Sequence, residues 1–248
     1  MKTILILSAV LLAFVNPLRA GDLPKDFRIT LFDGGGMTRQ GERIFLSADS
    51  SYYEWYDEGA DNKLYLSISE KKLEALYEII RSRNFEDIET YREEVYDRGG
   101  VSISVTADGE TISKEDGGQT FIQKAWQDNF NTVESEIRDL VDAELEKMLV
   151  DFTVYIDKSI AGADKIVNMH SSDLVYMSAR DGYPSKFELS VLPGEHYLSI
   201  IMMNKEITTV PGEKIFAQAD FILRADKDNN PERNSVTLYL DGNVIKSK

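Results

Sequence analysis

The stretch Val101–Ile112, VSISVTADGETI, decides the fold expected for the first half of the chain. It opens by alternating apolar and polar residues, a period of two that indicates a strand with one buried face. Asp108-Gly109 then supplies two residues that accept positive φ, as a tight hairpin requires, and Thr111-Ile112 begins the return strand. The stretch therefore predicts an antiparallel hairpin with one apolar face.

Two helical patterns can cover that apolar face. The first follows Ser69, a candidate N-cap, and has a single apolar stripe of Leu73, Leu76, Tyr77 and Ile80. The second is expected from about residue 119 to about residue 147, with a stripe of Ile122, Trp126, Phe130, Val133, Ile137 and Leu140 and a candidate kink at 128–131. Further strands are expected at 27–31, 43–47, 51–56 and 63–68. These elements predict an α+β domain in which two helices cover one face of an antiparallel sheet.

Residues 148–248 carry a different pattern. Short alternating segments recur at 152–156, 174–178, 187–191, 217–223 and 236–240, and no helical stripe interrupts them. Turn signals stand between them, among them Pro193-Gly194 and Asp241-Gly242. Short strands with frequent turns are typical of a β-sandwich. The expected division is an α+β domain at 21–147 followed by an all-β sandwich domain at 148–248.

Residues 1–20, MKTILILSAVLLAFVNPLRA, have the form of a secretory signal peptide, with Lys2, then an apolar run, then a small residue at Ala20. The alternative is an uncleaved anchor helix. No later segment approaches the ~18 consecutive apolar residues that a membrane span needs. We therefore expect an exported protein, periplasmic or extracellular, that does not insert into a membrane once the leader is removed. The sequence has no cysteine, so we expect neither disulfides nor a lipoprotein anchor.

The chain is acidic. Its formal net charge of −15 becomes −17 when Lys2 and Arg19 leave with the leader. An acidic surface repels phosphate backbones and anionic lipid headgroups, which argues against a nucleic-acid partner. It favours cations or a basic protein partner, and it is equally the surface of a well-solvated protein.

Three segments of the first half together resemble the emfourin type of bacterial protease inhibitors and a related group of exported domains. They are the FDGGG turn at 32–36, the helix SISEKKLEALYEII with NFEDI after it, and VYDRGGVSISVTADG before a closing helix. The resemblance covers roughly residues 26–145 and implies inhibition of a thermolysin-like metalloprotease. It assigns no inhibitory residue. The second half, through LPGEHYLSI at 192–200, resembles small sandwich modules of bacterial surface proteins, which bind or space rather than catalyse.

The aromatic cluster Tyr52, Tyr53, Trp55 and Tyr56 is a candidate binding surface. On a strand, Tyr53 and Trp55 share one face while Tyr52 and Tyr56 lie on the other. Both faces cannot be the single core of a two-layer domain. Some of these rings are therefore expected to be exposed or packed on the second half, and exposed rings would suit a protein or carbohydrate partner.

The glycine run DGGG, made of Asp33, Gly34, Gly35 and Gly36, is a second candidate binding segment, because its backbone amides could face an anion or a protein. It lacks the Lys-Ser/Thr of a phosphate loop, so a hairpin turn is the competing interpretation.

The run DKDNNPERN has oxygen-bearing residues at alternate positions, Asp226, Asp228, Asn230 and Glu232, as a calcium loop does. The sixth residue of such a loop should be Gly and the twelfth Glu, but here they are Pro231 and Thr237. A polar turn is therefore the first interpretation and a looser calcium site the second.

Catalytic spacing is not found in this sequence. His170 and His196 are its two histidines, so a zinc centre would need both of them and a carboxylate. No Gly-x-Ser-x-Gly nucleophile turn is present. We therefore expect no enzyme and no cofactor, with bound calcium as the alternative. The leading hypothesis is an exported non-catalytic protein that acts by protein contact, with protease inhibition and carbohydrate binding as alternatives.

Overall fold

The computed structural model describes residues 23–35, 41–57, 60–161, 165–170, 177–179, 186–204, 215–242 and 244–248. The structure is mostly β, with 51% of the chain in strands, several sheets and three α-helices among the described residues. The sheet-rich fold expected from the alternating patterns is thus confirmed at this level.

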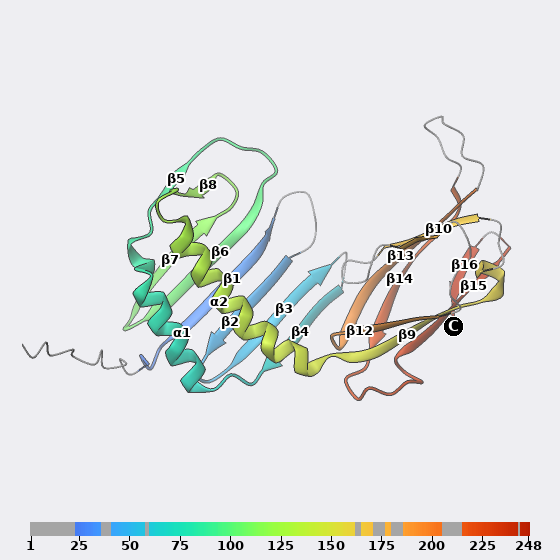
Figure 1. The fold of residues 1–248 in the computed structure, drawn as a ribbon, viewed down its shortest axis with the longest axis horizontal. Helices are drawn as coiled ribbons and strands as arrows, with labels where there is room; N and C mark the ends of the chain where they lie inside the picture. Colours follow the sequence, from blue (N-terminus) through green and yellow to red (C-terminus); the bar gives the residue numbers. More distant parts are fainter. Residues whose placement is uncertain are drawn as a thin grey trace, which may run out of the picture.

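A six-stranded antiparallel sheet forms the first part of the molecule (Figure 1). Its order is β4-β3-β2-β1-β6-β7, which leaves β4 and β7 at the edges. The strands are β1 (Arg28–Gly35), β2 (Gly41–Ser47), β3 (Ser51–Asp57), β4 (Ala60–Leu66), β6 (Gly99–Ala107) and β7 (Glu110–Asp116). The hairpin predicted from Val101–Ile112 is confirmed: β6 pairs with β7, and Asp108 and Gly109 both have positive φ.

Two helices, α1 (Glu70–Ser82) and α2 (Gln127–Leu145), lie across one face of this sheet (Figure 1). The sheet turns the side chains of alternate residues toward them, and these pack with the apolar stripes of both helices into one core. Its central members are Ile29, Leu31, Ile44, Leu46, Ile103, Leu73, Leu76, Ile80, Phe130, Val133 and Ile137. Ser69 precedes α1 as expected, but its hydroxyl makes no capping hydrogen bond; its carbonyl accepts from the amides of Lys72 and Leu73.

The second helix begins at Gln127, eight residues later than the expected start at residue 119. The turn at Gly117 and Gly118 comes first, and Thr120–Ile122 then forms a short strand, β8, paired with β5 (Thr90–Arg92). Ile122 is therefore buried from a strand rather than from the helix. The run DNFN does not interrupt α2, and Asn129 within it donates its side-chain amide to the carbonyl of Arg83 at the end of α1. Single-turn 3-10 helices, η1 (Phe85–Asp87) and η2 (Glu146–Met148), follow the two helices.

The rest of the described chain forms two four-stranded sheets. Their orders are β11-β10-β13-β14 and β12-β9-β15-β16, and β15 lies parallel to β9. The elements are β9 (Val150–Ile156), α3 (Lys158–Ala161), β10 (Lys165–His170), β11 (Met177–Ala179), β12 (Lys186–Val191), β13 (Gly194–Asn204), β14 (Ile215–Ala225), β15 (Ser235–Asp241) and β16 (Val244–Ser247). Both sheets contribute to a second core that includes Phe152, Val154, Ile200, Leu223 and Leu238. Of the alternation expected at 174–178, Leu174 and Tyr176 lie outside the described residues.

The Pro193-Gly194 turn connects two different sheets, because β12 pairs with β9 whereas β13 pairs with β10 and β14. This turn also meets the edge strand β4. Asn62 donates its side-chain amide to the carbonyl of Glu195 at 2.8 Å and accepts from the Glu195 amide at 2.8 Å. The side chain of Asn62 thus satisfies both backbone groups of Glu195 at the junction of the two cores.

Candidate functional site

The aromatic cluster on β3 is divided between the two faces of the sheet, as strand geometry requires. Tyr53 packs against the core beneath the helices, and its hydroxyl donates to Glu42 Oε2 at 2.9 Å. Trp55 is 7% exposed, and its ring centroid lies 6.2 Å from that of His196, itself buried at the start of β13. These two rings belong to the core and to the junction with the second part of the chain.

Tyr52 and Tyr56 lie on the opposite face of the sheet, away from the helices, together with three rings that the sequence analysis did not select. Tyr52 stacks on Phe45 with centroids 5.0 Å apart and meets Tyr65 edge-on at 6.4 Å. Tyr56 lies 6.4 Å from Phe32. We call Phe32, Phe45, Tyr52, Tyr56 and Tyr65 the outer aromatic face. Cross-strand register unites them, since Phe45 pairs with Tyr52 and Tyr52 with Tyr65.

A lysine and two hydroxyl pairs extend this outer face. Lys63 Nζ lies 3.4 Å from the centre of the Tyr52 ring and 2.7 Å from Glu54 Oε1. Toward β7, Ser104 and Ser113 lie within hydrogen-bond distance, as do Thr106 and Thr111. The face therefore combines flat rings with hydroxyl groups.

Asp33, the first residue of the glycine run, has a structural role. Asp33 Oδ2 accepts from Arg138 Nη2 at 2.6 Å, and Arg138 also pairs with Glu42 and Glu134. A Cβ at Gly41, which pairs with Gly34, would lie 2.3 Å from the Tyr56 hydroxyl oxygen and 2.4 Å from its ring, so glycine there leaves room for Tyr56 to lie across the sheet. Gly35 ends β1, whereas Gly36 lies outside the described residues.

The run DKDNNPERN forms a connection between β14 and β15, with its side chains turned onto its own backbone. Asp226 accepts from the Asp228 amide and from Arg233, and Asn230 accepts from the Glu232 amide. The Asp228 amide and Arg233 lower the pKa of Asp226. Within the described ranges, no three His, Asp or Glu side chains are placed to hold a metal ion. The register pairs His170 with Ser199 rather than with His196.

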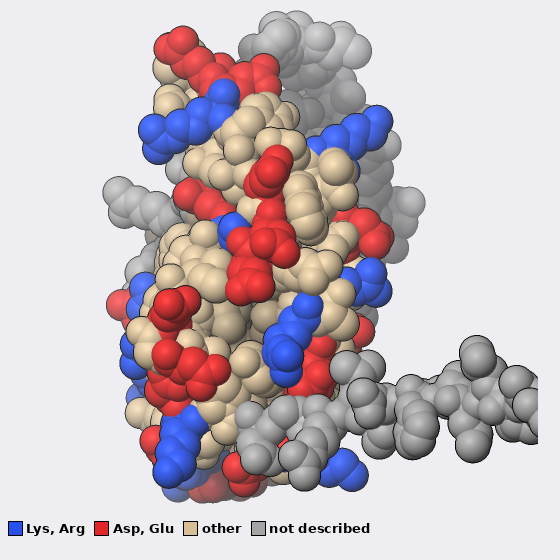
Figure 2. Space-filling model, turned by 90° about the vertical axis from the view of Figure 1, so that its left-hand side faces the viewer, with Lys and Arg blue, Asp and Glu red and all other residues tan. Residues whose placement is uncertain are grey.

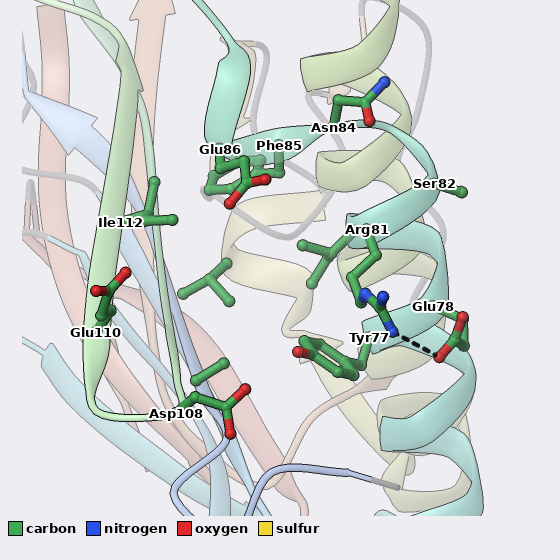
Figure 3. Close-up of a pocket in the computed structure, with 13 residues that line it drawn as sticks. Tyr77, Glu78, Arg81, Ser82, Asn84, Phe85, Glu86, Asp108, Glu110 and Ile112 are labelled. Atoms are coloured by element: carbon green, nitrogen blue, oxygen red, sulfur yellow. Dashed lines mark ion pairs between the residues drawn. The ribbon is translucent and has the colours of Figure 1, made fainter. Parts of the chain in front are cut away.

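A groove that the sequence analysis did not anticipate opens between α1 and the β6–β7 hairpin (Figure 3). Its volume of about 690 Å³ falls within the size range of ligand sites in proteins. Its apolar side chains come from both walls and are Ile80, Phe85, Val105, Ala107 and Ile112. Tyr77 reaches from α1 toward the hairpin, and Glu110 and Asp108 stand on the opposite wall (Figure 3).

Acidic groups dominate the rim of the groove. Glu78, Glu86, Asp108 and Glu110 line it, and Arg81, the one basic residue among its described lining, pairs with Glu78 at 3.6 Å. Burial, and next the negative charge of Asp108, raise the pKa of Tyr77. Asp26 fixes the hairpin turn by accepting from the Asp108 and Gly109 amides at 2.9 and 2.7 Å. The end of the molecule seen in Figure 2 carries several groups of acidic side chains, with basic side chains between them.

The sequence predicted the elements that form the two walls of this groove, but it did not predict that they face each other across a groove. The helix stripe and the hairpin were both predicted, whereas the groove also depends on strand order, which puts β7 at the edge of the sheet, where the groove lies between it and α1. Strand alternation shows which residues face the helices and does not show which strand ends the sheet.

Comparison with known proteins does not assign this chain to a family. No family model matches the chain, and none of the curated proteins matches it either. The resemblance to emfourin-type inhibitors therefore stays a prediction. No helix within the described residues is long and apolar enough to cross a membrane.

Proposed function

We propose that this chain is an exported, non-catalytic protein that acts by contact with another protein, through the groove between α1 and β7. The groove carries the proposal, because it joins an apolar floor to an acidic rim beside β7, an edge strand of the six-stranded sheet. Apolar surface surrounded by polar groups is typical of protein-interaction sites. The acidic rim agrees with the net charge of the whole chain, which favours a basic partner.

The proposal includes the domain division expected from the sequence. The first core would define an α+β domain at 21–147 and the second a β-sandwich domain at 148–248. Asn62, Trp55 and Gly194 would then fix the two domains to each other. Export rests on the pattern of residues 1–20.

Site-specific photo-crosslinking tests the contact. A photoreactive amino acid at Ser82, an exposed position on the groove rim, is expected to form a covalent adduct with one protein in the producing cell. The same amino acid at Ser190, an exposed position on β12, is the matched control and is expected to form none. No adduct at Ser82, or equal adducts at both positions, would contradict a contact at the groove.

A thermolysin-like metalloprotease is the first partner class to test, because the resemblance of residues 26–145 implies one. The mature chain at micromolar concentration is expected to inhibit such a protease, and Glu110→Lys in the groove is expected to weaken the inhibition. Undiminished protease activity would remove inhibition from the proposal and leave other protein partners in place.

A second candidate function is carbohydrate binding at the outer aromatic face. The observation that favours it is the row of rings beside hydroxyl groups, with Tyr65 67% exposed. Tyr52→Ala and Tyr65→Ala are each expected to reduce retention on a glycan array, whereas Tyr155→Ala, an exposed tyrosine on β9, should not. Equal retention by all three variants would count against this function. Trp55 is a poor probe, because its ring is buried at the junction.

A further inference from the structure

No strand among the described residues pairs with the outer edge of β7. In the six-stranded sheet β7 is the terminal strand and pairs with β6 alone. The neighbouring β8 contacts β7 but belongs to a separate two-stranded sheet, and the isolated bridge found among the described residues joins Gly117 and Thr120, beyond the end of β7. An edge of this kind can accept a further strand from another chain.

Register shows which backbone groups face that open side. The two-residue turn makes Ala107 and Glu110 a hydrogen-bonded pair, so Val105 pairs with Ile112 and Ile103 with Lys114 in the same way. The amides and carbonyls of Thr111, Ser113 and Glu115 then point outward. No backbone hydrogen bond found among the described residues uses these outward groups.

The groove lies directly beneath the same edge. Glu110 and Ile112 point from β7 toward the helices, so an added strand would turn every second side chain into the space between β7 and α1. Lys114 closes one end of this space, since its Nζ donates to the carbonyls of Glu86 and Ile88 at 2.8 and 2.6 Å. The available length is therefore the part of β7 before Lys114.

The negative charge of the groove favours a positively charged occupant. A side chain entering the groove from the edge passes Glu110 on one wall and Glu86 on the other, both exposed. Arg81 is already paired with Glu78 on the helix side. Lysine or arginine fits this setting, because its aliphatic stem can lie on Ile80 and Phe85 while its charge meets the carboxylates.

We propose that β7 binds an extended, basic segment of a partner protein by strand addition, with alternate Lys or Arg side chains of that segment in the groove. The backbone groups of Thr111 and Ser113 supply the hydrogen bonds, and Glu86 and Glu110 supply the selectivity for positive charge. This inference rests on the proposed function, of which it specifies the partner's chemistry and binding mode.

Three labelled eight-residue peptides test the proposal on the full mature chain. They are an alternating Val-Lys peptide, an alternating Val-Glu peptide, and the Val-Lys peptide with methyl groups on alternate backbone nitrogens. The Val-Lys peptide is expected to bind saturably, and methylation of its backbone should weaken binding about tenfold, because it removes hydrogen bonds to β7. The Val-Glu peptide is expected not to bind. Equal binding of all three, or of none, would overturn the proposal.

Two variants locate the binding. Thr111→Pro removes one outward-facing amide and keeps the pairing with β6, since proline is tolerated at such edge positions. It is expected to weaken the Val-Lys peptide about tenfold with unchanged circular dichroism. Glu86→Lys with Glu110→Lys should weaken it by a similar factor, whereas Glu146→Lys, an exposed glutamate at the end of α2, should not. Unchanged affinity in both groove variants would place the peptide elsewhere and overturn the proposal.

Self-association of the chain is a further outcome, which the experiments must distinguish from binding of a basic segment. If sedimentation shows that the chain dimerises and that Thr111→Pro abolishes the dimer, the occupant of the edge is a second copy and the basic-segment proposal fails. An adduct at Ser82 without binding of the Val-Lys peptide would likewise refute strand addition while leaving the proposed function intact. Absence of both the adduct and peptide binding would refute the two together.

Discussion

Arg138 connects helix α2 to the sheet through side chains from three elements. Its guanidinium pairs with Asp33 of β1, Glu42 of β2 and Glu134 of α2. Burial alone would lower the pKa of Arg138, but the hydrogen bonds and charges of Glu42 and Glu134 outweigh it and raise the pKa. Asp33, expected from the sequence to be a binding residue, therefore has a structural partner on α2.

Arg138→Gln is expected to lower the free energy of unfolding by about 1–3 kcal/mol, because it leaves three carboxylates together without a counter-charge. Denaturant unfolding measures the change. Arg233→Gln is the matched control, because Arg233 pairs with Asp226 at an exposed site, and little change is expected there. Equal effects of the two substitutions would contradict the role given to Arg138.

Glu144 gives the stability a dependence on pH. It is a buried carboxylate that accepts from Lys147 and from Lys72 of α1, and these bonds lower its pKa below the ordinary value of 4.5. Because the folded pKa is the lower one, the stabilisation is fully present above pH 4.5 and is lost as the pH falls through the folded pKa. Glu144→Gln should therefore cost about 1–2 kcal/mol of unfolding free energy at pH 7 and progressively less on acidification. A cost that stays constant down to pH 3 would be inconsistent with this assignment.

The element that joins the two cores is the turn before β13. Gly194 has φ +140°, and a Cβ there would lie 2.5 Å from Asn62 Oδ1 and 3.3 Å from the Trp55 ring. The sequence analysis identified Pro193-Gly194 as a turn. It could not show that the turn changes sheets and packs on β4, because that depends on partners more than 130 residues away in the chain.

Gly194→Ala is expected to lower the free energy of unfolding by about 2–4 kcal/mol and to shift tryptophan fluorescence to longer wavelength, as Trp55 becomes exposed. Gly242→Ala is its control, since Gly242 also has positive φ but nothing lies within 4 Å of its Cβ position. The control isolates the backbone cost, about 1 kcal/mol, and should leave the fluorescence unchanged. Similar behaviour of both variants would show that Gly194 is not confined by Asn62 and Trp55.

For the whole molecule, local patterns predicted the elements better than their assembly. The period of two in Val101–Ile112 and the stripe of Leu73, Leu76 and Ile80 identified the hairpin, the first helix and much of their core. The start of the second helix was wrong, because the apolar stripe runs through Ile122, which lies in the short strand β8 paired with β5. A hydrophobic period marks burial and does not by itself distinguish a short strand from a helical turn.

The prediction of candidate sites had the same limit, because sequence patterns identified single residues and not their assembly. Tyr52 and Tyr56 were selected as aromatic residues close in sequence, whereas Phe32, Phe45 and Tyr65 join them only through cross-strand register. The groove depends on strand order, which places β7 at the end of the sheet beside α1. Neither register nor strand order follows from alternation alone.

Amide hydrogen exchange at β7 tests the central claim most directly. In the free protein the amides of Thr111 and Ser113 should exchange rapidly, while the amide of Ile112, paired with Val105, should be protected. Addition of the Val-Lys peptide should protect Thr111 and Ser113 and leave Ile112 unchanged. Thr111 and Ser113 amides that are already protected in the free protein, or that stay unprotected at saturating peptide, would contradict an open edge that receives a partner strand.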